Sequence, residues 1–324
     1  MQLGLLTAFI LLLAGFFLLA WAANSSVSGA ATLAKKFGLS SRLIGLTIIA
    51  LGTSIPEMVI SVIAALHGNP NIAIGNVMGS NIANIGLVLG ITALIVPLKV
   101  RSTTLRKEFP LLFISMLIVG AFMLSGKLGR GDGILLLIGA TLVIFWLIQE
   151  GKRRKKFLRK DVLEAEYRKE IEAKVPLKKA ILQIAFGLIL LPISSNLIVK
   201  SSIHIAHHFN ISDLIIGLTI VALGTSLPEL ATSLACARKK EYDIIIGNVI
   251  GSNIFNLLAV IGLPAIICQI HVAPHLFIDF AMMFGITVLL FFFAFGHKDK
   301  KVLTKTKGSI LLAAYITYLI ILCI

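Results

Sequence analysis

Charge is scarce in this chain of 324 residues, and acidic charge is scarcest. Only 14% of the residues are Asp, Glu, Lys or Arg, and 15 are acidic against 30 Lys and Arg. Hydrophobic residues make up 57% of the sequence. A soluble protein of this length could not bury so much apolar surface, so a soluble globular class is excluded.

Several motifs that mark other classes of protein are missing. The chain has no Walker loop and no HExxH motif, so neither an ATP-driven machine nor a zinc hydrolase is indicated. Its three cysteines, Cys236, Cys268 and Cys323, form no CxxC or metal-ligand spacing and are interpreted as small packing residues. We therefore expect neither an enzyme nor a bound cofactor.

Long apolar runs dominate instead. About 20 apolar residues cross the ~30 Å hydrocarbon core of a bilayer as a helix. Ten spans are predicted, at 3–22, 42–66, 72–97, 108–125, 132–150, 179–200, 213–236, 244–268, 275–296 and 308–324. The first is expected to be an uncleaved helix rather than a signal peptide, because no Lys or Arg precedes Lys35. The fold class is thus an all-α polytopic membrane protein.

Basic residues gather in alternate loops, which is the positive-inside pattern. With the N-terminus outside, 27 of the 30 Lys and Arg lie on the inner side, and only Lys127, Arg130 and Lys200 lie outside. The net charge of +15 therefore reflects topology and not a nucleic-acid partner. We expect a multi-pass protein of the cell (inner) membrane with both termini on the outer, periplasmic side.

A polar stretch at 151–178 divides the ten spans into halves of five, 1–150 and 179–324. It is predicted to be a basic cytoplasmic linker, and its cluster of Lys and Arg is interpreted as a topology anchor beside anionic lipid. Because five is odd, the second half enters the membrane from the opposite side. Such inverted repeats are typical of secondary transporters, with the substrate site near the bilayer midplane.

One pair of motifs occurs twice at a constant offset along the chain, in the cores 42–97 and 213–268. The run GLTIIALGTSIPE ends on Glu57, and GLTIVALGTSLPE ends on Glu229. Each is followed at the same distance by a second run, GNVMGSNIAN in one half and GNVIGSNIFN in the other. Over the 46 positions that align without gaps from Gly45 and Gly217, 25 are identical.

Each copy places its glutamate near the middle of an apolar span. An ionised carboxylate there costs several kcal/mol, roughly 3 or more. No Lys or Arg lies near either glutamate to compensate it, since Arg42, at the first residue of its span, is assigned to the inner loop. The missing countercharge is most simply a transported cation. The alternative is a neutral glutamate that donates a hydrogen bond to a neighbouring helix.

The neighbours of both glutamates supply oxygen atoms. Pro56 and Pro228 have no N–H, so the carbonyls of Gly52 and Gly224 lose their helical donors. Hydroxyls and amides add to these in both copies: Thr53, Ser54, Ser80, Asn84, Thr225, Ser226, Ser252 and Asn256. Two further amides, Asn81 and Asn253, are left open between ligand and structural roles. Oxygen donors favour Na⁺, Ca²⁺ or Mg²⁺, and a flexible mixed cage suits Ca²⁺ better than Mg²⁺.

The paired motifs resemble the two alpha-repeats of the calcium/cation antiporter superfamily, especially those of prokaryotic sodium/calcium exchangers. The resemblance implies that the ions lie between the second, third, seventh and eighth helices, while the first and sixth slide to alternate access. It implies a ligand set made of Glu57, Glu229, the Ala50 and Ala222 carbonyls, Thr53, Ser54, Ser80, Asn84, Thr225, Ser226, Ser252 and Asn256. Some relatives carry Asp at the position of Asn256, so potassium co-transport is not expected.

The sequence therefore predicts a secondary active antiporter that exchanges Na⁺ for Ca²⁺ and functions as a monomer without an obligate protein partner. Glu57 and Glu229 would serve both ions. A Ca²⁺/H⁺ antiporter that uses the same glutamates is the nearest alternative. A passive cation channel is a second, and a membrane-embedded hydrolase with paired carboxylates is a third.

Overall fold

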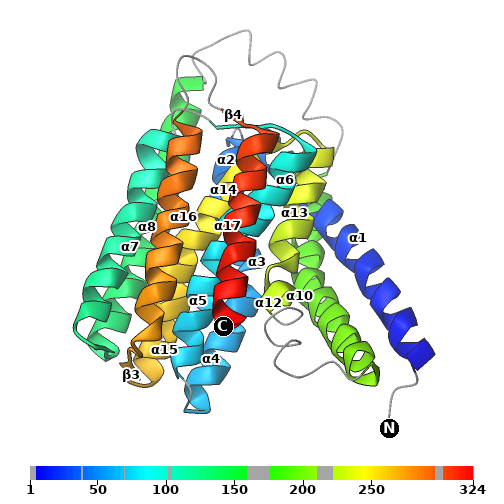
Figure 1. The fold of residues 1–324 in the computed structure, drawn as a ribbon. Helices are drawn as coiled ribbons and strands as arrows, with labels where there is room; N and C mark the ends of the chain where they lie inside the picture. The colour runs from blue at the N-terminus through cyan, green and yellow to red at the C-terminus, as the bar shows by residue number, and fades with distance from the viewer. Residues whose placement is uncertain are drawn as a thin grey trace.

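The structure is a computed structural model that describes residues 5–37, 39–68, 70–100, 104–158, 176–209, 222–295 and 302–323. Long helices lie side by side (Figure 1). Eight described helices are long and apolar enough to cross a membrane, and a bent pair of helices at 41–53 and 55–66 makes a ninth. The predicted span 213–236 is described only from Ala222 onward, so the tenth span stays a prediction.

The first half of the chain provides four of the long helices and the bent pair. Its elements are α1 (Leu5–Phe37), α2 (Ser41–Ile44), η1 (Gly45–Ile49), α3 (Ala50–Thr53), α4 (Ile55–Leu66), α5 (Pro70–Ala83), η2 (Asn84–Leu89), α6 (Gly90–Ile95), β1 (Leu98–Lys99), η3 (Thr104–Glu108), α7 (Phe109–Leu124), β2 (Lys127–Leu128) and α8 (Arg130–Leu158). Elements labelled η are π-helical turns.

The second half provides the other four long helices. Its described elements are α10 (Leu177–His208), α12 (Ala222–Thr225), α13 (Leu227–Arg238), α14 (Tyr242–Phe255), η5 (Asn256–Val260), α15 (Ile261–Ile267), β3 (Ile270–His271), α16 (His275–Ala294), β4 (Val302–Leu303) and α17 (Lys305–Cys323). Together α14, η5 and α15 form the most enclosed span of the described bundle, because every residue of its most apolar window is buried.

The first helix is longer than the sequence predicted. Hydropathy falls at the polar run that begins at Asn24, yet α1 continues to Phe37. The hydroxyls of Ser28 and Thr32 donate to the carbonyls of Asn24 and Ser28, four residues earlier, at 2.8 and 2.9 Å. Because these polar groups are satisfied within the helix, they do not end it.

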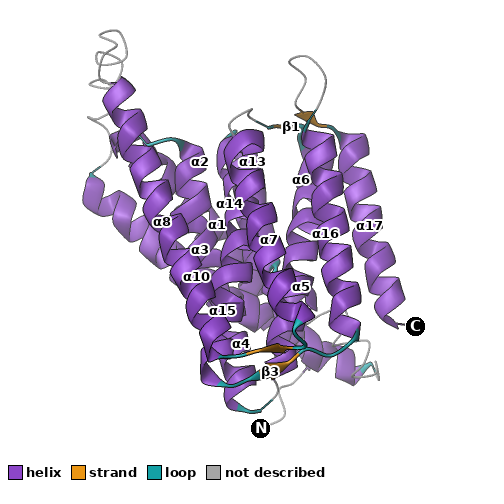
Figure 2. Ribbon diagram, turned by 90° about the vertical axis from the view of Figure 1, so that its left-hand side faces the viewer, coloured by secondary structure: helices purple, strands orange, loops and turns teal. Residues whose placement is uncertain are grey.

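Two short strand pairs lie at opposite ends of the bundle (Figures 1 and 2). At one end β1 pairs with β4, and at the other β2 pairs with β3, both antiparallel. The strands β1 and β3 follow equivalent helices, and their first residues, Leu98 and Ile270, occupy equivalent positions of the sequence repeat. Equivalent segments of the two halves therefore lie at opposite ends of the bundle.

The helices α1 and α10 pack along each other beside the rest of the bundle (Figure 1). Small residues let their backbones approach closely. A Cβ atom at Gly187 would lie 2.7 Å from the Ala22 carbonyl oxygen and 2.7 Å from the Ser26 nitrogen. A Cβ at Gly15, the position equivalent to Gly187 in the first half, would lie 2.7 Å from the side chain of Ile198. Each helix thus contributes one glycine at an equivalent position, and each glycine contacts the other helix.

Glycines also bring α14 against the bent span. A Cβ at Gly247 would lie 2.4 Å from the Arg42 carbonyl oxygen, and one at Gly251 would lie 2.6 Å from the Leu46 carbonyl oxygen. These are backbone atoms of helices and cannot move aside. This close packing joins the first half of the bent span to the buried span of the other half.

We predict that Gly247→Ala lowers thermal stability in detergent by about 1–3 kcal/mol, because the added methyl overpacks a backbone contact. Gly285→Ala is the matched control. It lies within α16, and no described atom lies within 4 Å of a Cβ placed there. The control should retain its unfolding midpoint. An equal midpoint for Gly247→Ala would contradict the assignment of this contact.

Candidate functional site

A break in the helix stands before each of the two glutamates. On one side α3 ends at Thr53 and α4 begins at Ile55, with a bend of 40°. The residue between them, Ser54, has φ −82° and ψ 2°, and Ser226 in the other half has φ −88° and ψ 0°. The same two backbone angles thus break both spans, where Pro56 and Pro228 prevent the usual helical hydrogen bond.

Each glutamate lies in the first turn of the helix that begins after the break. Glu57 is in the first turn of α4 and Glu229 in the first turn of α13. The N-terminus of a helix carries partial positive charge and unpaired N–H groups, which favour an anion. The proline motif therefore creates, inside each span, the helix end that best stabilises a carboxylate.

Both carboxylates are enclosed. Glu57 is 1% exposed and Glu229 is fully buried. Among the described residues, neither oxygen of Glu229 and not Oε2 of Glu57 has a hydrogen-bond partner. Four more oxygens in the matched motifs are also buried and unpartnered: those of Ser54, Ser226, Asn84 and Asn256. The unpartnered oxygens thus come from a Glu, a Ser and an Asn in each repeat, at equivalent positions.

Contacts between the halves bring the two motifs together. The Thr53 hydroxyl lies 3.3 Å from Asn248 Oδ1 and 3.4 Å from the Ser252 hydroxyl. Ser252 in turn donates to the Ala50 carbonyl at 3.4 Å. The helix α13, which carries Glu229, packs on α14, and α14 also contacts α3, directly before the helix of Glu57. The two buried acids thus belong to one site.

Four asparagines form a network across the interface of the halves. Asn81 donates to the Asn253 carbonyl at 3.3 Å, and Asn253 donates to the Asn81 carbonyl at 3.4 Å. The amide of Asn84 donates to Asn253 Oδ1, and that of Asn256 donates to Asn81 Oδ1, both at 3.0 Å. Each bond has an equivalent in the other half, so the network has approximate two-fold symmetry.

This network separates the roles that the sequence left open. Asn81 and Asn253 use their carbonyl, side-chain oxygen and amide to join the halves, which is a structural role. Asn84 and Asn256 take part in the network only through their amide nitrogens, and their side-chain oxygens accept no hydrogen bond from the described residues. The π-helical turns η2 and η5 begin at these two residues, and such turns are frequent at functional sites.

The carbonyl that Pro228 deprives of its helical donor finds another partner. The Ser195 hydroxyl of α10 donates to the Gly224 carbonyl. Beside this contact lies a cavity of about 370 Å³ between α4, α10 and α12, lined by Pro56, Ser195 and Thr225 among others. The cavity therefore reaches the proline of the first motif and the threonine of the second.

The remaining predicted ligands lie around these groups. Ser80 is buried on α5, and the backbone of Ala222 begins α12. The side chain of Ala222, and the start of the second motif from Gly217 to Val221, lie outside the described residues. Within the described part of the chain, no three His, Cys, Asp or Glu side chains converge. The oxygens near the two acids are therefore mostly neutral.

Sequence reasoning did not single out a second set of polar residues. Asn76 donates to the Glu57 carbonyl at 3.3 Å and to the Ser61 hydroxyl at 3.1 Å. Its equivalent, Asn248, contacts Thr53. Both asparagines are the second letter of the repeated GNV runs, so their identity in both copies was the available signal.

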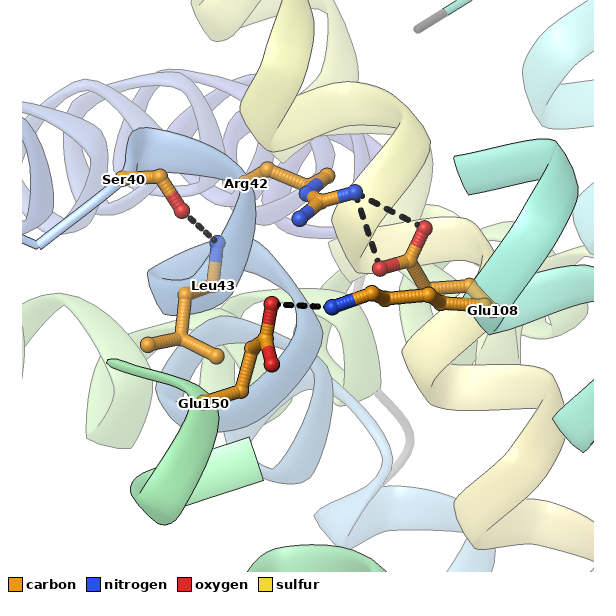
Figure 3. Close-up of polar contacts among 6 residues, drawn as sticks. Ser40, Arg42, Leu43, Glu108 and Glu150 are labelled. Carbon is orange, nitrogen blue, oxygen red and sulfur yellow. Dashed lines mark hydrogen bonds and ion pairs between the residues drawn. The ribbon is translucent and has the colours of Figure 1, made fainter. Parts of the chain in front are cut away.

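A buried ion pair at the start of the bent span was also missed (Figure 3). Arg42 Nη1 lies 2.9 and 3.0 Å from the two carboxylate oxygens of Glu108, and both side chains are buried. Nearby, Lys107 pairs with Glu150 at a more exposed position. The sequence assigned Arg42 only to an inner loop, and nothing in the spacing of the two residues indicated the contact.

An enclosed, oxygen-lined site with two acids, set between the halves of a multi-span helical bundle, defines the chain as a membrane transporter. The family model described as "Sodium/calcium exchanger protein" matches residues 7–149 and 179–324, and the chain belongs to this family. The resemblance seen in the paired motifs is thereby confirmed, and the chain is not an enzyme.

Individual relatives match along nearly the whole chain. CaxA of Alkalimonas amylolytica is 42% identical over 315 residues, covering 97% of this chain and 98% of that one. The sodium/calcium exchanger MaX1 of Methanosarcina acetivorans is 31% identical, covering 97% and 98%. A solved structure of the sodium–calcium exchanger NCX_Mj, soaked with Na⁺ and Sr²⁺, superposes with a TM-score of 0.82 at 30% identity, covering 98% and 99%.

We predict that Asn81→Ala and Asn253→Ala each destabilise the protein by about 1–3 kcal/mol, because each leaves buried partners unsatisfied. The two changes should not add in a double-mutant cycle, since the residues share bonds. Thr141→Ala is the control, because its hydroxyl bonds only within exposed α8. Additive unfolding energies for the Asn pair would contradict the network.

We predict that Glu108→Gln costs about 3–5 kcal/mol of stability, because it removes one partner of a buried ion pair. The double variant Arg42→Met with Glu108→Leu should recover much of that loss. Glu150→Gln, which changes the more exposed pair, should cost under about 1 kcal/mol. Equal unfolding midpoints for Glu108→Gln and Glu150→Gln would show that burial does not govern the first pair.

Proposed function

We propose that this protein is a secondary active antiporter that exchanges Na⁺ for Ca²⁺ across the cell membrane by alternating access. One observation carries the proposal. Two buried carboxylates, Glu57 and Glu229, meet at matched helix N-termini, and three of their four oxygens have no hydrogen-bond partner among the described residues. Each such carboxylate needs a countercharge in the bilayer.

The chemistry of the site favours hard cations as that countercharge. Its proposed donors are the oxygens of carboxylates, hydroxyls, amides and backbone carbonyls. Two acids balance one Ca²⁺ or two Na⁺. The proposed ligands are Glu57, Glu229, the Ala50 and Ala222 carbonyls, Thr53, Ser54, Ser80, Asn84, Thr225, Ser226, Ser252 and Asn256.

Coupling follows from competition for the same acids. While Ca²⁺ occupies Glu57 and Glu229, Na⁺ cannot use them, and the reverse holds as well. Ions then cross only by exchange, without ATP. If more than two Na⁺ move per Ca²⁺, each net charge gains or loses about 2.3 kcal/mol per 100 mV of membrane potential.

Relatives support Na⁺ as the counter-ion. MaX1 and NCX_Mj are both named as sodium/calcium exchangers. A proton could replace Na⁺ on the same glutamates, and Ca²⁺/H⁺ antiport is the second candidate. Asn256 adds no third acid to the described site, so K⁺ co-transport is not proposed.

The proposed architecture has ten spans in two inverted halves, 1–150 and 179–324, joined by a cytoplasmic linker at 151–178. Strand pairs at opposite ends and the two-fold asparagine network support this arrangement. The proposed location is the cell (inner) membrane, as the name of the related inner membrane protein YrbG of Escherichia coli suggests. Both termini would lie outside, and the monomer would be the working unit.

In this orientation the outer and inner sides of the site are packed differently. The 370 Å³ cavity lies beside the outer parts of α4 and α10 and reaches Thr225. On the inner side, Gly247 and Gly251 hold α14 tightly against the bent span. This difference favours access to the site from the outer side.

The decisive experiment is reconstitution of the purified protein into liposomes with defined Na⁺, K⁺, H⁺ and Ca²⁺ gradients. We expect Ca²⁺ uptake that is driven by an outward Na⁺ gradient and not by a pH gradient. Uptake driven by the pH gradient alone would assign Ca²⁺/H⁺ exchange instead. Uptake that persists without any counter-ion would identify a channel and overturn the proposal.

We predict that Glu57→Gln and Glu229→Gln each reduce coupled uptake to background, because the neutral amide cannot balance a bound cation. Both variants should remain folded, since the change is nearly isosteric. Glu241→Gln is the control, because Glu241 lies in the connection between α13 and α14. Normal Na⁺-driven uptake by either site variant would refute the site.

A further inference from the structure

A second pocket lies between the middle of α1 and the inner end of α10, away from the two buried acids. It has a volume of about 580 Å³ and is also bordered by the end of α13. Three lysines line it, namely Lys178, Lys179 and Lys239, and no acidic residue is among its described lining residues. Such a lining repels cations, so the pocket is not a route for the proposed ions.

The lining of this pocket changes from polar to apolar along α1 and α10. Lys179 and Phe186 are seven residues apart on α10, and Ser28 and Trp21 are seven apart on α1, which corresponds to about 10 Å along a helix. The Ser25 hydroxyl donates to the Gln183 carbonyl at 3.2 Å, so the two helices are in register at this level. Both walls thus run from lysines and hydroxyls to aromatic rings.

The aromatic end of the pocket faces outward from the bundle. Trp21 is 49% exposed and Phe186 is 55% exposed, and both belong to helices with the length and hydropathy of membrane spans. At the polar end, Lys239 Nζ donates to the Ser28 hydroxyl. An ammonium group has three donors, so Lys239 keeps capacity for an anionic ligand.

We propose that this pocket is a specific site for an anionic phospholipid of the inner leaflet. The phosphate would sit among Lys178, Lys179 and Lys239, and the acyl chains would follow Phe186 and Trp21. A free phosphate or nucleotide would match the lysines but leave the apolar wall unused. A phospholipid fits the whole pocket, because its charged headgroup and its apolar chains follow each other in the same order and at a similar spacing as the lysines and the aromatic rings.

A lipid bound in this pocket would link three helices. Lys239 directly follows α13, the helix that carries Glu229, whereas Lys178 and Lys179 begin α10. A phosphate bound to all three would tie α13 to the α1–α10 pair. The lipid would therefore stabilise one relative position of these helices.

The test is lipid retention by the purified full-length protein in detergent, measured by native mass spectrometry. The probes are phosphatidylglycerol and phosphatidylcholine with the same acyl chains. We expect selective retention of phosphatidylglycerol, weakened roughly 30-fold in the variant Lys179→Gln with Lys239→Gln, because two cations near the headgroup are lost. The matched control is Lys99→Gln with Lys305→Gln, two exposed lysines outside the pocket.

Each outcome decides the proposal. Equal retention of the two lipids, or equal loss of phosphatidylglycerol in the pocket and control variants, would overturn it. Inorganic phosphate at millimolar concentration should not displace the lipid. Displacement by phosphate alone would assign the pocket to small anions instead. Because retention is measured without transport, the result does not depend on the proposed exchange activity.

Discussion

A carboxylate in the hydrocarbon core of a bilayer has to be balanced, and the described structure is organised around two of them. Glu57 and Glu229 lie at new helix N-termini that their preceding prolines create. Partial positive charge from the helix ends lowers the cost of the negative charge but does not cancel it. The neutral oxygens of Ser54, Ser226 and Asn84 lie within the same motifs. The proposed cation would supply the remaining countercharge.

Symmetry gives this site its rigidity. Asn81 and Asn253 exchange hydrogen bonds across the interface, and each also receives an amide from the other half. Buried amide networks of this kind are costly to leave unsatisfied, so they fix the register of the helices that carry them. In contrast, α1 and α10 pack chiefly on each other through glycines. The molecule thus combines a fixed centre with a separate helix pair beside it.

The two halves are equivalent in geometry but not in every contact. The buried pair of Arg42 and Glu108 has no chemical counterpart, because the position equivalent to Glu108 is Phe280. That residue stacks on Phe284 within an aromatic cluster of α7 and α16. The two halves thus differ at this position, with an ion pair in the first half and an aromatic contact in the second.

The amino-acid sequence by itself determined the class and the centre of the protein. Apolar runs required a membrane, and the repeated motifs located Glu57 and Glu229 and indicated a family that comparison confirmed. These features are local or periodic, so they can be read along the chain. Hydropathy does not record the backbone angles with which the proline motif starts a new helix.

Only the tertiary structure decided which residues meet. The division between structural Asn81 and the free oxygen of Asn84 depends on partners in the other half of the chain, and the lysine pocket between α1, α10 and α13 depends on packing as well. Contacts between distant segments follow from how helices cross, and no spacing along the chain contains that information.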